Sequence, residues 1–274
     1  MKITISCGNE KLYPYLAELG YAGLDFGLDY NEEILTDSFR KSLLENFRSA
    51  ERAGLCAAQT HLPYWPSHIP PIGDGSYDAY EDYLYPRLAR GIELTAEMGC
   101  RTAVIHMYFE ADEEKSRAGN LRMLEKLLPV LEKNRVILSM ETIYGPGYSH
   151  AFLSSPADLL YYTDRFQSPY LGICLDSGHA VILGQDPVAF IPAVGKKLTA
   201  LHLHSALPRM DLHTIPGILP NVDYTRIAEN LKAVGYEGTF NMEIGPNHLI
   251  PESAYPDFYR FAFSMAQGFL GCDT

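Results

Sequence analysis

The sequence of 274 residues contains no apolar run long enough to cross a membrane. Its first ten residues, MKITISCGNE, are too short and too polar for the apolar core of a secretory signal. Its five cysteines are scattered, odd in number and include no CxxC pair. Four of them fall in or beside apolar runs, which predicts buried free thiols. We therefore expect a protein of the reducing cytoplasm that has no membrane partner.

Positive charge is also scarce. Lys and Arg number 22 against 34 Asp and Glu, which gives a formal net charge of −12. Proteins that bind nucleic acid neutralise phosphates with Lys and Arg, so this balance disfavours a nucleic-acid partner. The acid- and tyrosine-rich segment 73–86, GDGSYDAYEDYLYP, also fits poorly against a nucleic-acid duplex. No GxGxxG loop follows the first apolar run, which weakens a doubly wound dinucleotide-binding fold.

Short apolar runs alternate with longer amphipathic segments along the whole chain, which predicts strands alternating with helices. Parallel strands need such helical crossovers, so the fold class is α/β. Eight units, with strand ends on average about 34 residues apart, fit a (β/α)8 barrel of typically ~250 residues. We predict a single (β/α)8 TIM barrel over residues 1–274. The predicted strands are residues 2–7, 22–26, 55–61, 101–107, 135–141, 171–176, 198–204 and 238–244.

The last six predicted strands each carry, at or within two residues of their carboxyl ends, a residue that can bind a metal ion or transfer a proton. Active sites of barrel enzymes lie at these carboxyl ends and on the loops that follow. A carboxylate at the end of a buried strand is costly unless it is paired, hydrogen-bonded or metal-bound. A shared functional site therefore explains the pattern better than six separate structural roles. The six residues are His61, His106, Glu141, Asp176, His202 and Glu243.

Segment 201–217, LHLHSALPRMDLHTIPG, holds three of the nine histidines. Strand alternation puts His202 and His204 on one side, with His202 directed inward and His204 already at the rim. Asp211 and His213 return from the loop, close enough to each other to reach one cation.

The segment DSGHA adds His179, three residues after a strand-ending aspartate. The chain turns there, so both side chains can face one centre. Imidazoles combined with carboxylates favour Mn, Zn, Co or Fe over Mg or Ca. These groupings predict a divalent metal centre.

In this order and spacing the motifs resemble the xylose isomerase-like TIM barrels, the sugar (phosphate) isomerases and epimerases related to type IV apurinic endonucleases. The motifs are QTHLPY, VIHMYFE, SMETIYG, CLDSGHA, LHLHSALPRMDLHTIPG and FNMEIG. For the epimerase branch, the resemblance implies one divalent ion held by Glu141, Asp176, His202 and Glu243. The same branch implies substrate contacts from His179 and Arg209, and we expect further contacts from His61 and His106. We expect Glu141 and Glu243, on opposite sides of the barrel mouth, to act as the catalytic acid and base.

The endonuclease branch holds three zinc ions on nine ligands, and this chain has a suitable residue for each. The five beyond the epimerase set are His61, His106, His179, Asp211 and His213. We favour sugar chemistry because the net charge is negative and because the loop after the seventh strand lacks the HLND beginning typical of the endonucleases.

The expected function is therefore that of a sugar or sugar phosphate isomerase or epimerase that uses Mn, Zn or Co and a cis-enediolate. Three alternatives stay open: a type IV-like apurinic endonuclease with a multinuclear zinc site, an inosose dehydratase-like lyase, and a non-catalytic sugar-binding barrel. Lys196 and Lys197 precede the seventh strand, at the wrong end of the barrel for a phosphate site, which favours a free sugar. The aromatic segment 255–265, YPDFYRFAFSM, is compatible with a homo-oligomer.

Overall fold

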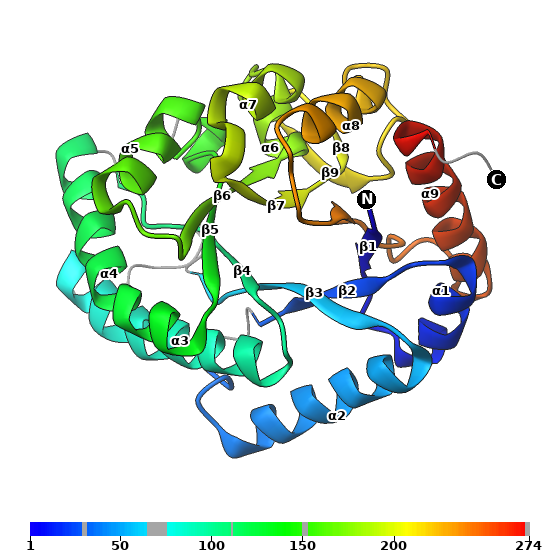
Figure 1. The fold of residues 1–274 in the computed structure, drawn as a ribbon, viewed down its shortest axis with the longest axis horizontal. Coiled ribbons are helices and arrows are strands. Elements are labelled where there is room, and N and C mark those ends of the chain that lie inside the picture. The colour runs from blue at the N-terminus through cyan, green and yellow to red at the C-terminus, as the bar shows by residue number, and fades with distance from the viewer. Residues whose placement is uncertain (29–31, 65–75, 111, 150–152, 272–274) are drawn as a thin grey trace.

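A computed structural model describes residues 1–28, 32–64, 76–110, 112–149 and 153–271. One parallel sheet runs in the order β10-β1-β2-β3-β4-β5-β6-β7, and it closes where Leu203 bridges Met242. There the Leu203 N–H donates to the Asn241 carbonyl at 3.0 Å. The predicted (β/α)8 barrel is confirmed (Figure 1). The barrel strands are β1 (Ile3–Ser6), β2 (Gly23–Gly27), β3 (Cys56–His61), β4 (Thr102–Ile105), β5 (Ile137–Glu141), β6 (Leu171–Asp176), β7 (Leu198–His202) and β10 (Phe240–Met242).

Helices form a ring around these strands (Figure 1). Most begin where the sequence supplies a capping side chain; Ser155, for example, forms a capping box with Asp158 at the start of α5. The short helices α1, α6 and α7 are absent from the sequence-based prediction, because so few residues show no clear periodicity. The helices are α1 (Tyr13–Leu19), α2 (Asp37–Ala53), α3 (Tyr77–Glu97), α4 (Glu113–Asn134), α5 (Pro156–Phe166), α6 (Ser177–Ile182), α7 (Pro187–Val194), α8 (Tyr224–Ala233) and α9 (Tyr255–Leu270).

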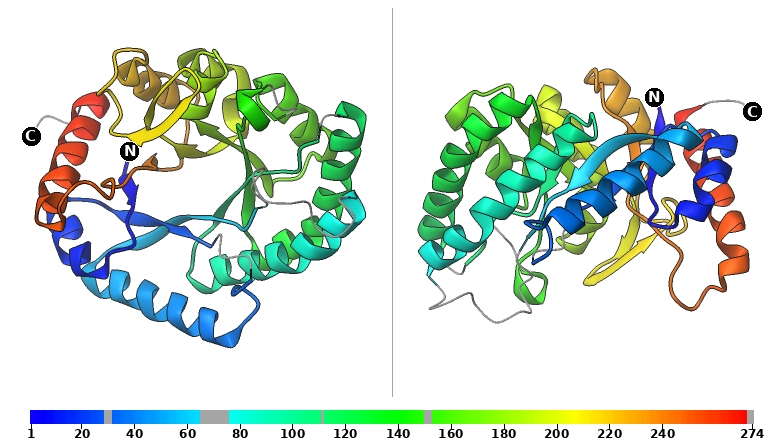
Figure 2. Two further views of the ribbon diagram at one scale, coloured as in Figure 1. Left: turned by 180° about the vertical axis from the view of Figure 1, so that it is seen from behind. Right: turned by 90° about the horizontal axis from the view of Figure 1, so that it is seen from below.

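An antiparallel hairpin, β8 (Ser205–Leu207) and β9 (Met210–Thr214), follows the seventh barrel strand. It lies at the end of the barrel opposite the N-terminus, which is the carboxyl end of the strands (Figure 2, right). The sequence predicted a proline-containing loop here; instead, the chain pairs with itself and packs against α6. The hairpin turn contains Arg209, whose φ of 62° is in the left-handed region.

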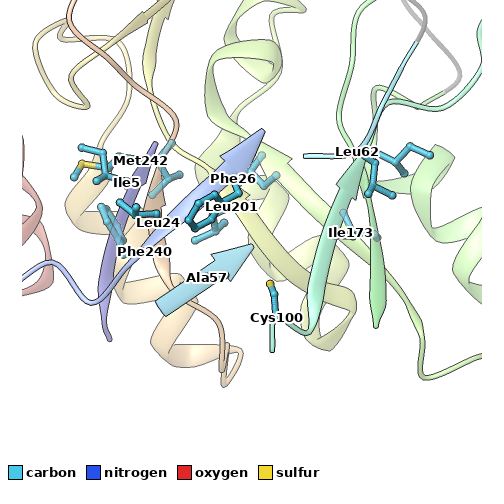
Figure 3. Packing of buried hydrophobic residues seen from close by; sticks show 14 of the residues in the cluster. Ile5, Leu24, Phe26, Ala57, Leu62, Cys100, Ile173, Leu201, Phe240 and Met242 are labelled. Carbon is cyan, nitrogen blue, oxygen red and sulfur yellow. The ribbon is translucent and has the colours of Figure 1, made fainter. Parts of the chain in front are cut away.

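The core lies inside the barrel and between the strands and helices. Ile5 pairs with Leu24 on one side and Met242 on the other, and all three side chains are fully buried. Figure 3 shows them packed together with Phe240. Strands buried on both faces are apolar at successive positions, which is why these runs were recognisable in the sequence.

Helix α9 buries Tyr259, Phe263 and Leu270 against its own barrel, whereas Phe261 stays exposed. A homo-oligomer that uses this helix stays a prediction. None of the described helices is both long enough and apolar enough to cross a membrane.

The described cysteines only partly match the expectation of buried thiols. Cys7, Cys100 and Cys174 are buried free thiols, as expected. Cys56 is exposed, because it is the first residue of β3 and not part of its buried centre. Cys272 lies outside the described residues.

Gly172 provides a test of the close approach between β6 and β7. A Cβ atom there would lie 2.0 Å from Thr199 Oγ1, which hydrogen-bonds Ser139 Oγ at 2.7 Å. We expect Gly172→Ala to lower the free energy of unfolding by about 1–3 kcal/mol through overpacking. Urea unfolding followed by circular dichroism measures this change. The control is Gly268→Ala, at an exposed helical position with open space around it, where stability should stay equal or rise. Equal midpoints for Gly172→Ala and wild type would contradict the packing.

Candidate metal-binding active site

Four residues at the carboxyl ends of the last four barrel strands form what we call the central cluster. Glu141 ends β5, Asp176 ends β6, His202 ends β7 and Glu243 follows β10 directly. One ligand atom from each lies within 4.8 Å of the other three. The structure thus brings together the four residues that the sequence predicted as metal ligands.

The central cluster fits a divalent cation. Both carboxylate oxygens of Glu141, Glu243 Oε2 and His202 Nδ1 are buried and form no aligned hydrogen bond with the described residues. His202 Nδ1 lies 3.1 Å from Glu141 Oε1 and 3.4 Å from Glu243 Oε2. Buried polar atoms without partners are costly, and a cation among them would remove that cost. A mixed carboxylate and imidazole set suits Mn, Co or Zn.

The first flanking cluster consists of His61, His106 and Glu141. Nε2 of His61 and Nε2 of His106 lie 3.4 Å and 3.0 Å from Glu141 Oε2. Glu141 therefore belongs to both this cluster and the central one.

The second flanking cluster consists of His179, His204, Asp211 and His213. Asp211 Oδ2 lies 3.3 Å from His179 Nε2, and Asp211 Oδ1 lies 3.3 Å from His213 Nε2. All nine candidate ligands named from the sequence consequently converge on one end of the barrel.

Backbone carbonyls orient three of the histidine rings. Because a carbonyl can only accept a hydrogen bond, the ring nitrogen that contacts it must carry the proton. The other nitrogen, Nε2, is then free to bind a cation, as in metal sites whose outer partners fix the tautomer. In each case Nδ1 donates: His61 to Leu62 at 3.0 Å, His179 to Thr142 at 2.8 Å and His213 to Glu243 at 3.0 Å.

Asp25 orients His202 from the opposite side, and the sequence analysis missed it. Its Oδ2 lies 3.3 Å from His202 Nε2 and also accepts hydrogen bonds from Gln59 at 2.9 Å and Asn241 at 3.1 Å. The carboxylate thereby turns His202 Nδ1 toward the central cluster. Asp25 lies inside β2 rather than at its end, so a search of strand ends passes over it.

His204 lies deeper in the structure than the sequence predicted. It is fully buried, and its Nε2 lies 3.0 Å from Asp176 Oδ1. Its ring stacks on His213 with 4.1 Å between ring centroids. A Cβ atom on Gly178 would lie 1.9 Å from His204 Cε1, so glycine is required there. The prediction of a rim position was wrong because the hairpin folds back over this residue.

Burial and neighbouring charges move the pKa values of this site in different directions. Burial raises the pKa of Glu141, but the charges of His202 and His106 lower it more, so the net pKa lies well below the usual range. Burial raises the pKa of Glu243, and the charge of Glu141 adds to that effect. For His213, burial lowers the pKa, yet the hydrogen bond with Asp211 and the charge of Glu243 raise it to about 10.

The clusters open into a cavity of about 1510 Å³. His61, His106 and His179 line it, as expected of substrate contacts. Arg209, the fourth expected contact, is exposed at the turn of the hairpin and is not among the described lining residues.

Comparisons with known proteins agree with this geometry. Residues 14–258 match the xylose isomerase-like TIM barrel family. The chain belongs to this family. An uncharacterised protein of Sinorhizobium fredii, y4fM, is 25% identical over 188 residues, or 65% of this chain and 58% of that protein. MJ1311 of Methanocaldococcus jannaschii, also uncharacterised, is 26% identical over 45% of this chain and 42% of its own length. The matches thus span about half the length of these relatives.

Solved structures share the fold across nearly the whole chain. D-psicose 3-epimerase with D-tagatose, from Clostridium cellulolyticum H10, has a TM-score of 0.78 at 14% identity and covers 99% of this chain and 100% of that one. The 3-keto-D-glucoside 4-epimerase YcjR from E. coli has a TM-score of 0.74 at 18% identity, with 96% and 99% covered. At these sequence identities the structural similarity establishes the barrel fold and does not establish the reaction.

Metal content tests the fit of the central cluster. We expect at least one divalent ion per purified wild-type chain and its loss in Glu141→Ala, since Glu141 is shared by two clusters. Chelation should lower the melting temperature of wild type only, because a bound ion at 1,000 times its Kd adds roughly 4 kcal/mol of stability. Elemental analysis and thermal unfolding measure both effects. Glu125→Ala, an exposed change on α4, is the control. Metal-free wild type, or full occupancy in Glu141→Ala, would refute the assignment.

Proposed function

We propose that the protein is a divalent-metal-dependent sugar isomerase or epimerase. The central cluster carries the proposal: Glu141 and Glu243 come from strands three positions apart around the barrel, and His202 contacts both. Two carboxylates on either side of one cation can exchange protons with the two opposite faces of one carbon atom of the bound substrate. The sugar epimerases among the structural neighbours support this choice.

The chemistry follows from the residue types. A divalent cation held by the central cluster would act as a Lewis acid on the carbonyl and hydroxyl oxygens of an open-chain sugar and acidify the C–H between them. One of Glu141 and Glu243 removes that proton, which leaves a cis-enediolate. The other glutamate returns a proton to the opposite face, which inverts the carbon. Return to the neighbouring carbon gives aldose–ketose isomerisation instead.

The flanking histidines bind and orient the substrate in this mechanism. His61, His106 and His179 line the cavity beside Glu141 and can hydrogen-bond sugar oxygens. Their rings are held by the contacts described above, so little reorganisation is needed when the substrate binds. We propose Mn, Zn or Co as the ion, a carbohydrate as the substrate and the cytoplasm as the location, without a nucleic-acid partner.

Substitution of either glutamate tests the acid and base roles. We expect Glu141→Gln and Glu243→Gln each to reduce turnover at least a hundredfold, since a general acid or base contributes roughly 10²–10⁴. The readout is hydrogen–deuterium exchange at the carbons next to the carbonyl. NMR detects this exchange for each sugar of a panel in D2O. Metal content is measured in parallel, and Glu125→Gln should behave as wild type. Turnover near wild type in either active-site variant would rule out the assigned role.

The second flanking cluster favours one competing function, a type IV-like apurinic endonuclease, because all nine candidate ligands converge. For sugar chemistry we expect the double variant Asp211→Ala/His213→Ala to keep one ion per chain and wild type not to cleave abasic-site DNA. Elemental analysis and a cleavage assay on a duplex with one abasic site measure both. Two or three zinc ions, lost in the double variant, together with strand cleavage would establish the endonuclease instead.

The same sugar panel separates the two remaining alternatives. A lyase of the inosose dehydratase type would eliminate water and yield a new enone or diketone signal rather than an epimer. A non-catalytic barrel would bind metal and sugar without exchange of any C–H.

A further inference from the structure

The cavity above the clusters is larger than one sugar ring requires. Its volume is about 1510 Å³, whereas sites for drug-sized ligands occupy roughly 300–1,000 Å³. A hexose is smaller than such ligands. The site therefore has room for more than the carbon atoms that react at the central cluster.

The additional space extends to a part of the barrel that contributes no candidate metal ligand. We call it the α1–α2 arm and define it by the lining residues Asn9, Tyr13, Phe39, Ser42 and Asn46. Asn9 follows β1, Tyr13 begins α1, and the other three lie in the N-terminal half or the middle of α2. The nine candidate ligands, by contrast, belong to β3 and to the elements after it. The arm thus lies beside the place of the reacting unit and not within the clusters.

The α1–α2 arm offers uncharged polar groups next to an aromatic ring. Asn9 and Asn46 carry amides, which both donate and accept hydrogen bonds, and Ser42 carries a hydroxyl. Asn46 Oδ1 accepts the Tyr13 hydroxyl at 2.8 Å, so one wall of the arm is fixed. Phe39 adds an apolar face from the same helix. Hydroxyl groups and an apolar C–H face are what a sugar ring presents.

Among its described residues, the cavity lining offers an anionic substituent histidines but no lysine or arginine. Among the described lining residues the carboxylates are Asp25, Glu33, Glu141, Asp211 and Glu243, and no lysine or arginine lines it. The segments outside the described residues, 29–31, 65–75, 111, 150–152 and 272–274, also contain neither residue in sequence.

The loops that usually bind phosphate in TIM barrels also argue against a phosphorylated substrate here. They are the loops after the seventh and eighth strands. In this chain residues 203–223 contain one arginine, the exposed Arg209, and no lysine, and residues 243–251 contain neither residue type. A sugar phosphate would therefore meet carboxylates without a compensating arginine or lysine from these loops.

We propose that the substrate is a neutral saccharide of at least two units. The unit that carries the carbonyl lies against the central cluster, and the glycosidically linked unit occupies the α1–α2 arm. This inference rests on the proposed function and specifies its substrate class.

A matched series of sugars tests the substrate class on the metal-loaded full chain. D-Fructose, isomaltulose and D-fructose 6-phosphate share one reacting unit and differ at O6, which carries hydrogen, glucosyl or phosphate. Maltulose places the glucosyl group at O4 instead. D-Glucose, maltose, which carries its second glucosyl group at O4, and D-glucose 6-phosphate form an aldose series. The readout is kcat/KM for hydrogen–deuterium exchange next to the carbonyl.

We expect at least one disaccharide to exceed its monosaccharide at least tenfold in kcat/KM, with the phosphate no better than the monosaccharide. A monosaccharide or phosphate that equals or exceeds every disaccharide of its series overturns the inference and leaves the proposed function standing. No exchange with any of the seven sugars overturns both.

Blocking the α1–α2 arm gives an independent test of the same idea. Ser42 is exposed at its edge, so Ser42→Phe fills the arm without opening the core. We expect the ratio of kcat/KM for the preferred disaccharide to that for its monosaccharide to fall at least tenfold. Ser42→Leu replaces this variant if Ser42→Phe does not fold.

Lys41→Phe is the matched control, because Lys41 is exposed on the same helix and is not a lining residue. It should keep the wild-type ratio. An unchanged ratio in both folded Ser42 variants would show that the second unit does not occupy the arm.

Discussion

The concentration of buried negative charge at one end of the barrel is the constraint on which the site depends. Glu141 and Asp176 are almost completely buried, and Glu243 and Asp211 lie beside them. Burial of ionised carboxylates costs several kcal/mol per group unless cations or hydrogen bonds compensate. Imidazole rings provide part of the compensation, and the unsatisfied oxygens of Glu141 mark where a cation would provide the rest.

The surrounding chain holds these groups in place before any substrate arrives. The Thr142 hydroxyl accepts the Asp176 N–H at 2.8 Å, and Asp176 Oδ1 in turn accepts the His179 N–H at 2.7 Å as the cap of α6. His213 adopts a φ of 43° within the hairpin, a conformation that such residues hold only when their surroundings impose it. A site made of fixed groups stabilises developing charge without reorganising, which is the property that proton transfer at carbon needs.

The sequence predicted the parts of this arrangement that follow from local pattern. All eight barrel strands were recognisable because parallel buried strands are apolar at most positions, and residues at or next to the ends of six of them gave six candidate ligands. Asp25, His204 and Arg209 show where such reasoning ends. Asp25 lies inside a strand and is held by hydrogen bonds from Gln59 and Asn241, which are distant from it in sequence. The positions of His204 and Arg209 depend on how the β8–β9 hairpin folds over the barrel. The periodicity of a strand does not predict that fold.

The hairpin also explains why one ligand set is compatible with two chemistries. It brings Asp211 and His213 to the site and so completes the nine-residue set that the resemblance to the endonuclease branch implies. Beyond the candidate ligands, the described lining holds the carboxylates Asp25 and Glu33 and no lysine or arginine, whereas DNA binding rests on neutralised phosphates. Tyr144 donates its hydroxyl to Asp211 at 3.1 Å, which occupies part of that carboxylate with a protein partner. In the proposed assignment, the electrostatics of the cavity weigh more than the identity of the ligands and favour sugar chemistry.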